Sequence, residues 1–542
     1  MLIIGVDGAG PDLIERFVAD GRMPHTAALI ERGSFAALRS TTPATTFPAW
    51  TSFLTGAPPS AHGIPDFTIR HGYRVRFTGA GDRTLPTLFA HLERAGITTG
   101  AAWFPVTYPP EPLSGFSIAG WDSPVTNSGD SSFVLPAKLH RELVAQFGGG
   151  HLDFAAFDEF DGSGSAADHA TALVRATRRR AEIARWLLER RPVDVAAFHF
   201  GATDTAAHHF WAFHDPGSPR RRAPVQPELE HALADIYAAM DDAIGSLVET
   251  VGDDTAIVAL SDHGSRGASD VAVHLNRALE IAGLLAFTRG SSKAIDACGA
   301  RSTAVAATPR SLRRRLFRFA GGLAPALAES ALRFGGIDWR RTRAFSEELS
   351  YAPSVWINQL GREPQGTVRF REREAVARDV EAALRRVTLD DGGPLVDRVL
   401  LREEVHRGPH RRRFPDLVVE LRDVLGYAPV CLPSRAPGPA VERLAEGELL
   451  GRKGRSMPGC HARLGMLIVA GGGTARRDLS GAAIEDVAPL VCEILGVPGA
   501  PWYGKPIPGP GYGFQIPRDR AYTLAEQRTV ATRLRSLGYL EE

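Results

Sequence analysis

The stretch TPATTFPAWTSFLTGAPPSAHGIPDF (residues 42–67) is the one from which the fold and the chemistry of this chain are predicted. Residues 49–54 predict a helix, and Pro48 suits its first turn, because the fixed φ matches a helix and the missing N–H needs no partner. Thr46 therefore stands at or just before a helix N-terminus, where free N–H groups and the helix dipole favour an alkoxide or a phosphate. A threonine that only caps the helix is the competing interpretation.

Strands that alternate with helices surround this stretch. Buried strands are expected at residues 2–6, 194–200, 257–260 and 466–470. From residue 227 to 248, apolar side chains at three- and four-residue intervals predict a long helix. Strands that are buried on both faces and alternate with helices imply an α/β fold with a mostly parallel central sheet sandwiched by helices.

The character of the chain changes between about residues 290 and 440, where shorter strand-like pieces follow one another. This part also holds an arginine-rich run, residues 309–318, which fits a solvated helix face, a membrane-surface segment or a binding site for an anionic substrate. We expect three parts: a catalytic core, an inserted α+β cap, and a C-terminal helical tail that packs on the core. They span residues 1–290 with 440–505, residues 291–439, and residues 506–542, respectively.

The composition is that of an ordinary globular protein, with 44% hydrophobic and 23% charged residues. A formal net charge of +1 gives no general attraction to nucleic acid or to an anionic membrane. The cysteines, Cys298, Cys431, Cys460 and Cys492, are far apart and predict free thiols in a reducing compartment. Because residues 2–6 fit a strand better than a signal peptide, and no run is apolar enough to span a membrane, we expect a cytoplasmic protein. Its oligomeric state stays open.

Aspartates and histidines stand at the ends of the expected strands or just beyond them. Asp204 and His208 are four residues apart, which places both side chains on one face of a helical turn. Ligands of open α/β sheets gather at the carboxyl ends of the strands, and Zn²⁺, or Mn²⁺, accepts both residue types. Each motif alone fits an ion pair or a capping aspartate equally well, but together they predict a site for two divalent metal ions. The candidate ligands are Asp7, Asp204, His208, Asp262, His263 and His461.

Two metal ions beside a threonine suit the chemistry of phosphate esters. Two cations roughly 4 Å apart can hold the attacking and leaving oxygens of an in-line displacement. One ion would bind Thr46 and lower the pKa of its hydroxyl, and the other would stabilise the leaving oxygen and later supply hydroxide to cleave the phosphothreonine.

The order of these motifs resembles the type I phosphodiesterase/nucleotide pyrophosphatase branch of the alkaline phosphatase superfamily, and more closely a bacterial group of predicted phosphohydrolases or phosphomutases. The motifs are Asp7, the TFPAWTSFLTG and HGI block, D-x-x-x-H, SDHG, and a late G-x-H before an apolar strand. The resemblance implies one metal ion surrounded by Asp7, Thr46, Asp262 and His263, and a second surrounded by Asp204, His208 and His461. The family spacing selects His208 over His209 and gives Cys460 no role, although a thiol there could be a soft ligand.

The residues after Thr46 bear on the substrate. The nucleotide pyrophosphatases have Phe-Pro-Asn after the nucleophile, whereas this chain has Ala49 at the third position, so a backbone N–H such as that of Phe47 would replace the amide. The sulfatase motif is absent, and no arginine follows Thr46 closely to bind a dianionic monoester. We therefore expect hydrolysis of a phosphodiester or pyrophosphate bond in a small molecule, with Phe47, Trp50 and Tyr108 as candidate substrate-binding residues. The alternatives are a phosphomonoesterase, a phosphomutase, and a non-enzymatic metal- or lipid-binding protein.

Overall fold

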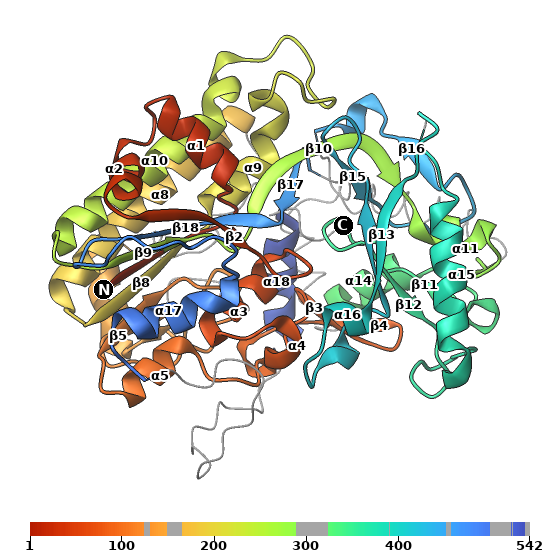
Figure 1. The fold of residues 1–542 in the computed structure, drawn as a ribbon, viewed down its shortest axis with the longest axis horizontal. Coiled ribbons are helices and arrows are strands. Elements are labelled where there is room, and N and C mark those ends of the chain that lie inside the picture. Colours follow the sequence, from red (N-terminus) through yellow and green to blue (C-terminus); the bar gives the residue numbers. More distant parts are fainter. Residues whose placement is uncertain are drawn as a thin grey trace, which may run out of the picture.

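The computed structural model describes residues 1–123, 131–148, 165–288, 324–389, 391–450, 457–498, 522 and 524–536. In these residues the chain forms a larger and a smaller lobe that lie side by side (Figure 1). The long strand β10 (Gly264–Val273) runs from the larger lobe into the smaller one. Among the helices of these ranges, none combines the length and the hydropathy that a bilayer crossing requires.

The larger lobe is built on an eight-stranded sheet with the order β2-β18-β9-β1-β8-β5-β6-β7. Strand β1 pairs in parallel with β8 and β9, and β5 pairs in parallel with β8 and β6. Strand β18 is antiparallel to β9 and β2, and β7 is antiparallel to β6. The expected mostly parallel central sheet is confirmed. Its strands are β1 (Leu2–Val6), β2 (Ser34–Arg39), β5 (Thr99–Ala102), β6 (Phe116–Ile118), β7 (Val134–Leu135), β8 (Val195–Phe200), β9 (Ile257–Leu260) and β18 (Leu464–Ala470).

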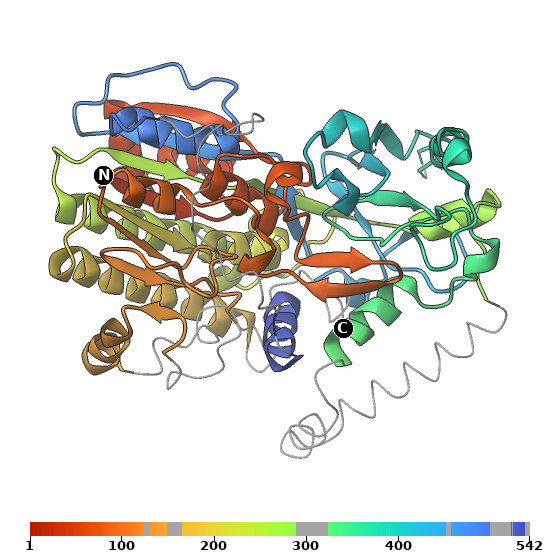
Figure 2. The ribbon, with the colours of Figure 1, turned by 90° about the horizontal axis from the view of Figure 1, so that it is seen from below.

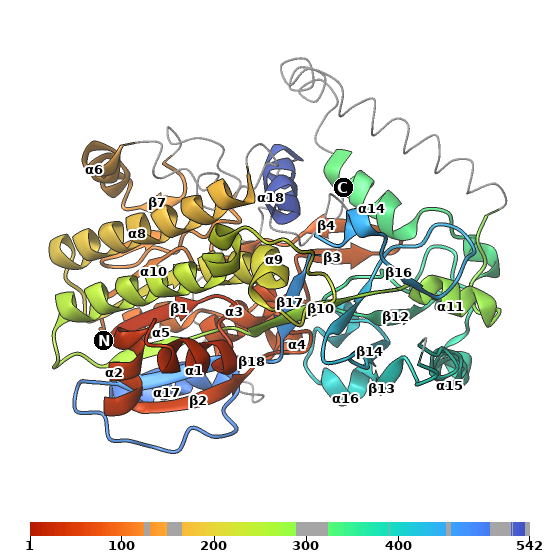
Figure 3. The same ribbon diagram turned by 90° about the horizontal axis from the view of Figure 1, so that it is seen from above.

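Alternate side chains of β1 enter the hydrophobic cores on the two faces of this sheet. Leu2 and Ile4 belong to one core and Ile3 to the other, which explains why the strand is a continuous apolar run. Helices α8 and α10 of the first core lie side by side (Figure 3). The helices of the first core are α1 (Pro11–Ala19), α2 (Pro24–Arg32), α6 (Ala137–Phe147), α8 (Ala166–Arg190), α9 (Ala202–His214) and α10 (Pro227–Val251); those of the second are α3 (Thr46–Thr55), α5 (Leu88–Arg94) and α17 (Val487–Ile494).

The smaller lobe contains two four-stranded sheets among the residues described. In the first, β10 pairs in parallel with β15 (Ala428–Cys431) and antiparallel with β16 (Val441–Arg443) and β17 (Gly459–Ala462). The second has the order β11-β12-β14-β13. Its strands are β11 (Ala344–Phe345), β12 (Ser354–Ile357), β13 (Val396–Leu401) and β14 (Leu417–Leu421), and the helices of this lobe are α11 (Leu275–Ile281), α14 (Ala324–Phe334), α15 (Arg373–Arg385) and α16 (Arg402–Val405).

The β3–β4 hairpin and helix α18 join the two lobes. The hairpin β3 (Thr68–His71) and β4 (Arg74–Phe77) extends from the larger lobe to α14, as Figure 2 shows. Helix α4 (Pro59–His62) precedes it, and α18 (Leu524–Ser536) packs between α14 and the core of the larger lobe. The boundaries expected for core, cap and tail stay a prediction. The arginine-rich run 309–318 and Cys298 lie outside the described residues, whereas Cys431, Cys460 and Cys492 are free thiols.

Candidate metal centre

The predicted ligands reach one place from several elements. Asp7 follows β1, Asp262 and His263 follow β9, and Asp204 lies in the first turn of α9 behind β8. Because β1, β8 and β9 are parallel neighbours, their carboxyl ends meet at one edge of the sheet. His208 comes from the next turn of α9, and His461 comes from β17, which pairs with β10. All of these side chains are at least nine-tenths buried.

The first group of donor atoms lies beside the hydroxyl of Thr46. His263 Nε2 lies 3.3 Å from Thr46 Oγ1, 3.2 Å from Asp262 Oδ2 and 3.5 Å from Asp7 Oδ1. The Asp7, Asp262 and His263 donors all lie within 4.8 Å of one another, so the three could hold one ion.

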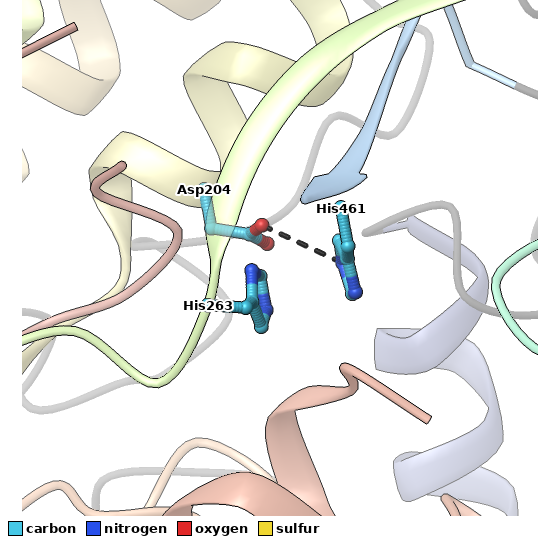
Figure 4. Close-up of side chains that lie close together, drawn as sticks. All are labelled: Asp204, His263 and His461. Atoms are coloured by element: carbon cyan, nitrogen blue, oxygen red, sulfur yellow. Dashed lines mark ion pairs between the residues drawn. The ribbon is translucent and has the colours of Figure 1, made fainter. Parts of the chain in front are cut away.

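The second group lies directly beside the first. His208 Nε2 is 3.1 Å from His461 Nε2 and 3.5 Å from Asp204 Oδ1, and His461 Nε2 is 3.7 Å from the same carboxylate oxygen. Asp204, His263 and His461 also bring donors within 4.8 Å of one another, and Figure 4 shows these three side chains converging. The rings of His263 and His461 stack with 3.8 Å between centroids, so the two groups touch.

The three histidines share one orientation. In each, Nδ1 contacts a backbone carbonyl oxygen, which can only accept a hydrogen bond, so Nδ1 carries the proton and the Nε2 lone pair faces the centre. The pairs are His208 Nδ1 with Gly459 O at 2.9 Å, His263 Nδ1 with Gly264 O at 3.0 Å, and His461 Nδ1 with Ala44 O at 2.7 Å.

This donor set fits divalent cations. Burial, with Asp7 nearby, raises the pKa of Asp262 well above its usual range, and burial lowers the pKa of His461, so the histidine is a neutral ligand. Neutral imidazoles and carboxylates are the ligands of Zn²⁺, and a tetrahedral ion with bonds of about 2.0–2.1 Å places ligand atoms roughly 3.3 Å apart. The separations of 3.1 to 3.7 Å in the second group are close to that value.

Asp7 is held by residues behind the centre. Its Oδ2 accepts hydrogen bonds from Trp50 Nε1 at 3.1 Å and from His199 Nε2 at 3.0 Å, and all three side chains are buried. The sequence interpretation missed His199. The available signal was a histidine in the otherwise apolar buried strand β8, where it pairs in register with Gly5. A side chain at Gly5 would collide with the Trp50 ring, since an added Cβ would lie 2.6 Å from it.

Thr46 is the first residue of α3 and is fully buried. Thr45 occupies the cap position, so Thr46 is not the N-cap residue that the competing interpretation supposed. The expected helix over residues 49–54 is confirmed. Phe47 packs against Phe67, with ring centroids 4.5 Å apart, and against Trp121 at 5.7 Å.

The other candidates occupy different surroundings. The His209 ring packs against His169, with centroids 5.2 Å apart. Cys460 directs its sulfur to the carbonyl of Gly267, away from His461, because neighbouring residues of a strand point to opposite faces. Phe47, Trp50 and Tyr108 are buried, and they are not among the described residues that line the cavity at the centre. Their role in substrate binding stays a prediction.

A cavity of about 730 Å³ opens beside His208 and His461, between the two lobes. Its walls come from the segment before Thr46, from Asp66, from Tyr351 of the smaller lobe and from the region around β14 and β15. A substrate in this cavity would reach the metal centre from the side of the second group.

The comparison with known families defines the class of protein, a phosphoester hydrolase. The sequence profile of the type I phosphodiesterase / nucleotide pyrophosphatase family matches residues 1–425. The chain belongs to the type I phosphodiesterase/nucleotide pyrophosphatase family, as the resemblance predicted. The matched range contains every predicted site residue except His461.

The solved structures that match the chain are distant from it in sequence. Phosphonoacetate hydrolase from Sinorhizobium meliloti, in complex with phosphonoformate, aligns with a TM-score of 0.52 and 15% identity over 90% of this chain and 93% of that chain. Human ectonucleotide pyrophosphatase/phosphodiesterase 5 aligns with a TM-score of 0.46 and 13% identity over 93% and 97% of the two chains. No curated protein sequence matches the chain.

Proposed function

We propose that this enzyme hydrolyses phosphodiester or pyrophosphate bonds of small molecules, with Thr46 as the nucleophile and two bound divalent metal ions. The observation that carries the proposal is the position of the Thr46 hydroxyl, 3.3 Å from His263 Nε2 and beside two groups of donor atoms. A buried threonine at a helix N-terminus beside an imidazole and its neighbouring carboxylates supports a role in phosphoryl transfer.

Each ion has a set of residues to hold it. Asp7, Asp262 and His263 would bind one ion next to Thr46, and Asp204, His208 and His461 would bind the other. Mixed nitrogen and oxygen donors make Zn²⁺ the first candidate and Mn²⁺ the second. When bound, the two ions supply positive charge to the phosphoryl oxygens and lower the pKa of the hydroxyl and of water.

The residues of the chain then perform the transfer. The Thr46 oxygen attacks phosphorus, the bond to the leaving oxygen breaks, and the product is a phosphothreonine that water cleaves in the second step. The N–H of Phe47 lies in the first turn of α3, where amides have no intrahelical acceptor. It can therefore donate a hydrogen bond to a phosphoryl oxygen, which the side chain of Ala49 cannot do. The α3 dipole favours the same negative charge.

Thr46→Ala and Thr46→Ser test the nucleophile. With Zn²⁺ or Mn²⁺ and bis(4-nitrophenyl) phosphate, we expect Thr46→Ala to lose at least about 10³-fold in kcat, and Thr46→Ser to keep part of the activity. Metal analysis should give about two ions per chain in all three proteins. A Thr46→Ala enzyme that keeps most of its kcat would refute the proposal.

A substrate panel tests the reaction class. Incubation with a diester, a monoester and a sugar phosphate, followed by phosphorus NMR, distinguishes free product from an isomerised substrate. The proposal expects the diester to be cleaved fastest. Faster cleavage of the monoester would identify a phosphomonoesterase, and an isomer of the sugar phosphate would identify a phosphomutase.

A further inference from the structure

A second polar cluster lines the same cavity, outside the metal centre. It consists of Asp66, Tyr351 and Glu347, which face the cavity, and of Glu329 and Arg333 behind them, and we call it the Asp66 cluster. The Tyr351 hydroxyl donates a hydrogen bond to Asp66 Oδ2 at 3.2 Å. Asp66 is only 8% exposed, and its Oδ1 has no hydrogen-bond partner among the described residues. A buried carboxylate with one unsatisfied oxygen at a cavity wall calls for an explanation.

The Asp66 cluster lies one side chain away from the metal centre. The Tyr351 ring is near-parallel to the His461 ring, with 6.5 Å between centroids and 29° between planes. On the other side, Phe67, which follows Asp66, packs against Phe47, the residue after Thr46. The Asp66 cluster therefore lies next to His461, on the cavity side of the metal centre.

The Asp66 cluster has more negative than positive charge. Arg333 Nε lies 2.7 Å from Glu329 Oε1, and Arg333 Nη1 lies 2.9 Å from Glu347 Oε2, so one guanidinium faces two glutamates and, more distantly, Asp66. Burial raises the pKa of Asp66 to about 7, which is the response expected of a carboxylate whose charge is incompletely compensated.

Two arginines of the cavity wall are each paired with a carboxylate. Arg266 forms a two-pronged ion pair with Asp423, with both N–O distances 2.8 Å. Arg70 pairs with Glu363 through two nitrogens, again at 2.8 Å, and the same glutamate accepts a hydrogen bond from Arg362. In the Asp66 cluster, by contrast, the three carboxylates of Asp66, Glu329 and Glu347 share the one guanidinium of Arg333.

We propose that the Asp66 cluster binds an ammonium group on the organic arm of the substrate, so that aminoalkyl phosphodiesters are the preferred substrates. This inference rests on the proposed function, because the phosphorus must lie at Thr46. The ammonium would donate to Asp66 and supply the missing positive charge, while Tyr351 packs against the methylene groups. If the Asp66 cluster only ties the hairpin and α14 to the core, substrate charge makes no difference.

Three 4-nitrophenyl phosphodiesters with arms of similar length test the inference: 2-aminoethyl, 2-hydroxyethyl and propyl. At pH 7.5, we expect the wild-type enzyme to prefer the aminoethyl over the propyl ester by about tenfold or more in kcat/KM. Asp66→Asn should reduce this preference to below about threefold, because the aminoethyl ester loses more kcat/KM than the propyl ester does. Asp423→Asn, which removes a paired carboxylate of the same cavity, should leave the preference unchanged.

Equal turnover of the three esters by the wild type would overturn the inference, as would an equal loss for all arms in Asp66→Asn. Where Asp66→Asn does not fold, Glu347→Gln removes one negative charge of the Asp66 cluster and should also lower the preference. A binding measurement on a variant that cannot react tests this inference independently of the proposed function. Calorimetry of metal-loaded Thr46→Ala with the non-reactive methyl esters of the aminoethyl and propyl phosphates should retain the preference even if no ester is hydrolysed, and equal affinities would refute it.

Discussion

Asp7 illustrates how a single carboxylate is prepared for a metal ion. Its Oδ2 receives two N–H groups, from Trp50 and His199, while its Oδ1 faces His263. The two donors fix the plane of the carboxylate in the absence of an ion. Hydrogen bonds of this kind, made to a metal ligand from behind the site, set the orientation of the ligand and its affinity for the metal. The burial of Trp50 therefore has a purpose beyond packing.

His199 is expected to control metal affinity at the first group. His199→Leu removes the hydrogen bond to Asp7 and should lower the affinity for the metal ion at the first group by about 10–100-fold. His199→Gln keeps an N–H and should lose less of this affinity. Chelator competition on the apoprotein measures the affinity without reference to turnover. His274→Leu is the control, because His274 makes a comparable contact with Glu442 at 2.9 Å in the smaller lobe. Equal affinities in wild type and His199→Leu would exclude this role.

The neighbours His208 and His209 should behave differently. His208 Nε2 is among the donors of the second group, whereas the His209 ring packs against His169. We expect His208→Ala to reduce bound metal from about two ions to about one per chain, and His209→Ala to leave it at two. Metal analysis after gel filtration decides the matter, and the reverse result would exchange the two assignments.

At the scale of elements, helices α3 and α4 form one unit around Thr46, the proposed nucleophile. Ser52 Oγ of α3 lies 3.0 Å from His62 Nε2 of α4, and His62 Nδ1 accepts the N–H of Ile64. Nε2 therefore carries the proton and donates to the serine. Burial, with Arg83 nearby, lowers the pKa of His62 to about 3, so the imidazole is neutral at neutral pH.

This unit predicts a pH dependence with a definite sign. Since the pKa of His62 is about 3 in the folded protein and about 6.5 in the unfolded chain, the unfolded chain binds more protons below pH 6.5, and stability is lost as the pH falls through that range. The loss between pH 7.5 and pH 5.0 is about 2 kcal/mol. His62→Gln lacks this dependence. The difference in unfolding free energy between the wild type and His62→Gln should therefore be about 2 kcal/mol smaller at pH 5.0 than at pH 7.5. Urea unfolding in EDTA measures it, with Ser52→Ala as a variant that does not titrate, and a pH-independent difference would contradict the assignment.

The elements themselves were largely predictable from the sequence. The four apolar runs and the 227–248 periodicity became β1, β8, β9, β18 and α10, because burial on both faces of a sheet and on one face of a helix leaves a local pattern. The antiparallel direction of β18 was not predictable, since it depends on which elements the chain visits between β9 and residue 464.

The candidate site was predictable to the extent that its residues stand in local motifs. Asp7, Asp262 and His263 follow strands, and their convergence follows from parallel neighbours. His199 and the contact of Tyr351 with Asp66 could not be found in this way. Both depend on pairs far apart in the chain, 192 and 285 residues respectively, whose meeting is decided by tertiary packing.

At the scale of the whole molecule, helix α18 contacts the segment that packs against Phe47, the residue after Thr46. Arg533 of α18 donates hydrogen bonds to the carbonyl oxygens of Trp121 and Ser123, and its side chain is buried. The Trp121 ring packs against Phe47, the residue after Thr46. Val530 and Leu534 of the same helix are fully buried in the core of the larger lobe. The C-terminal helix therefore supports the loop on which the first turn of α3 rests.

Arg533→Met should accordingly affect both stability and turnover. The substitution keeps apolar volume but leaves two buried carbonyl oxygens without their donor, which should cost about 2–4 kcal/mol of unfolding free energy. Because Trp121 then holds Phe47 less firmly, we expect kcat to fall by about 3- to 10-fold at saturating metal, with metal content unchanged. Urea unfolding and turnover of bis(4-nitrophenyl) phosphate measure the two effects, with Thr532→Ala, an exposed change on α18, as control. A loss of stability with full kcat would limit α18 to anchoring the fold, whereas a fall in kcat well below the unfolding temperature would establish that the C-terminal helix positions the nucleophile.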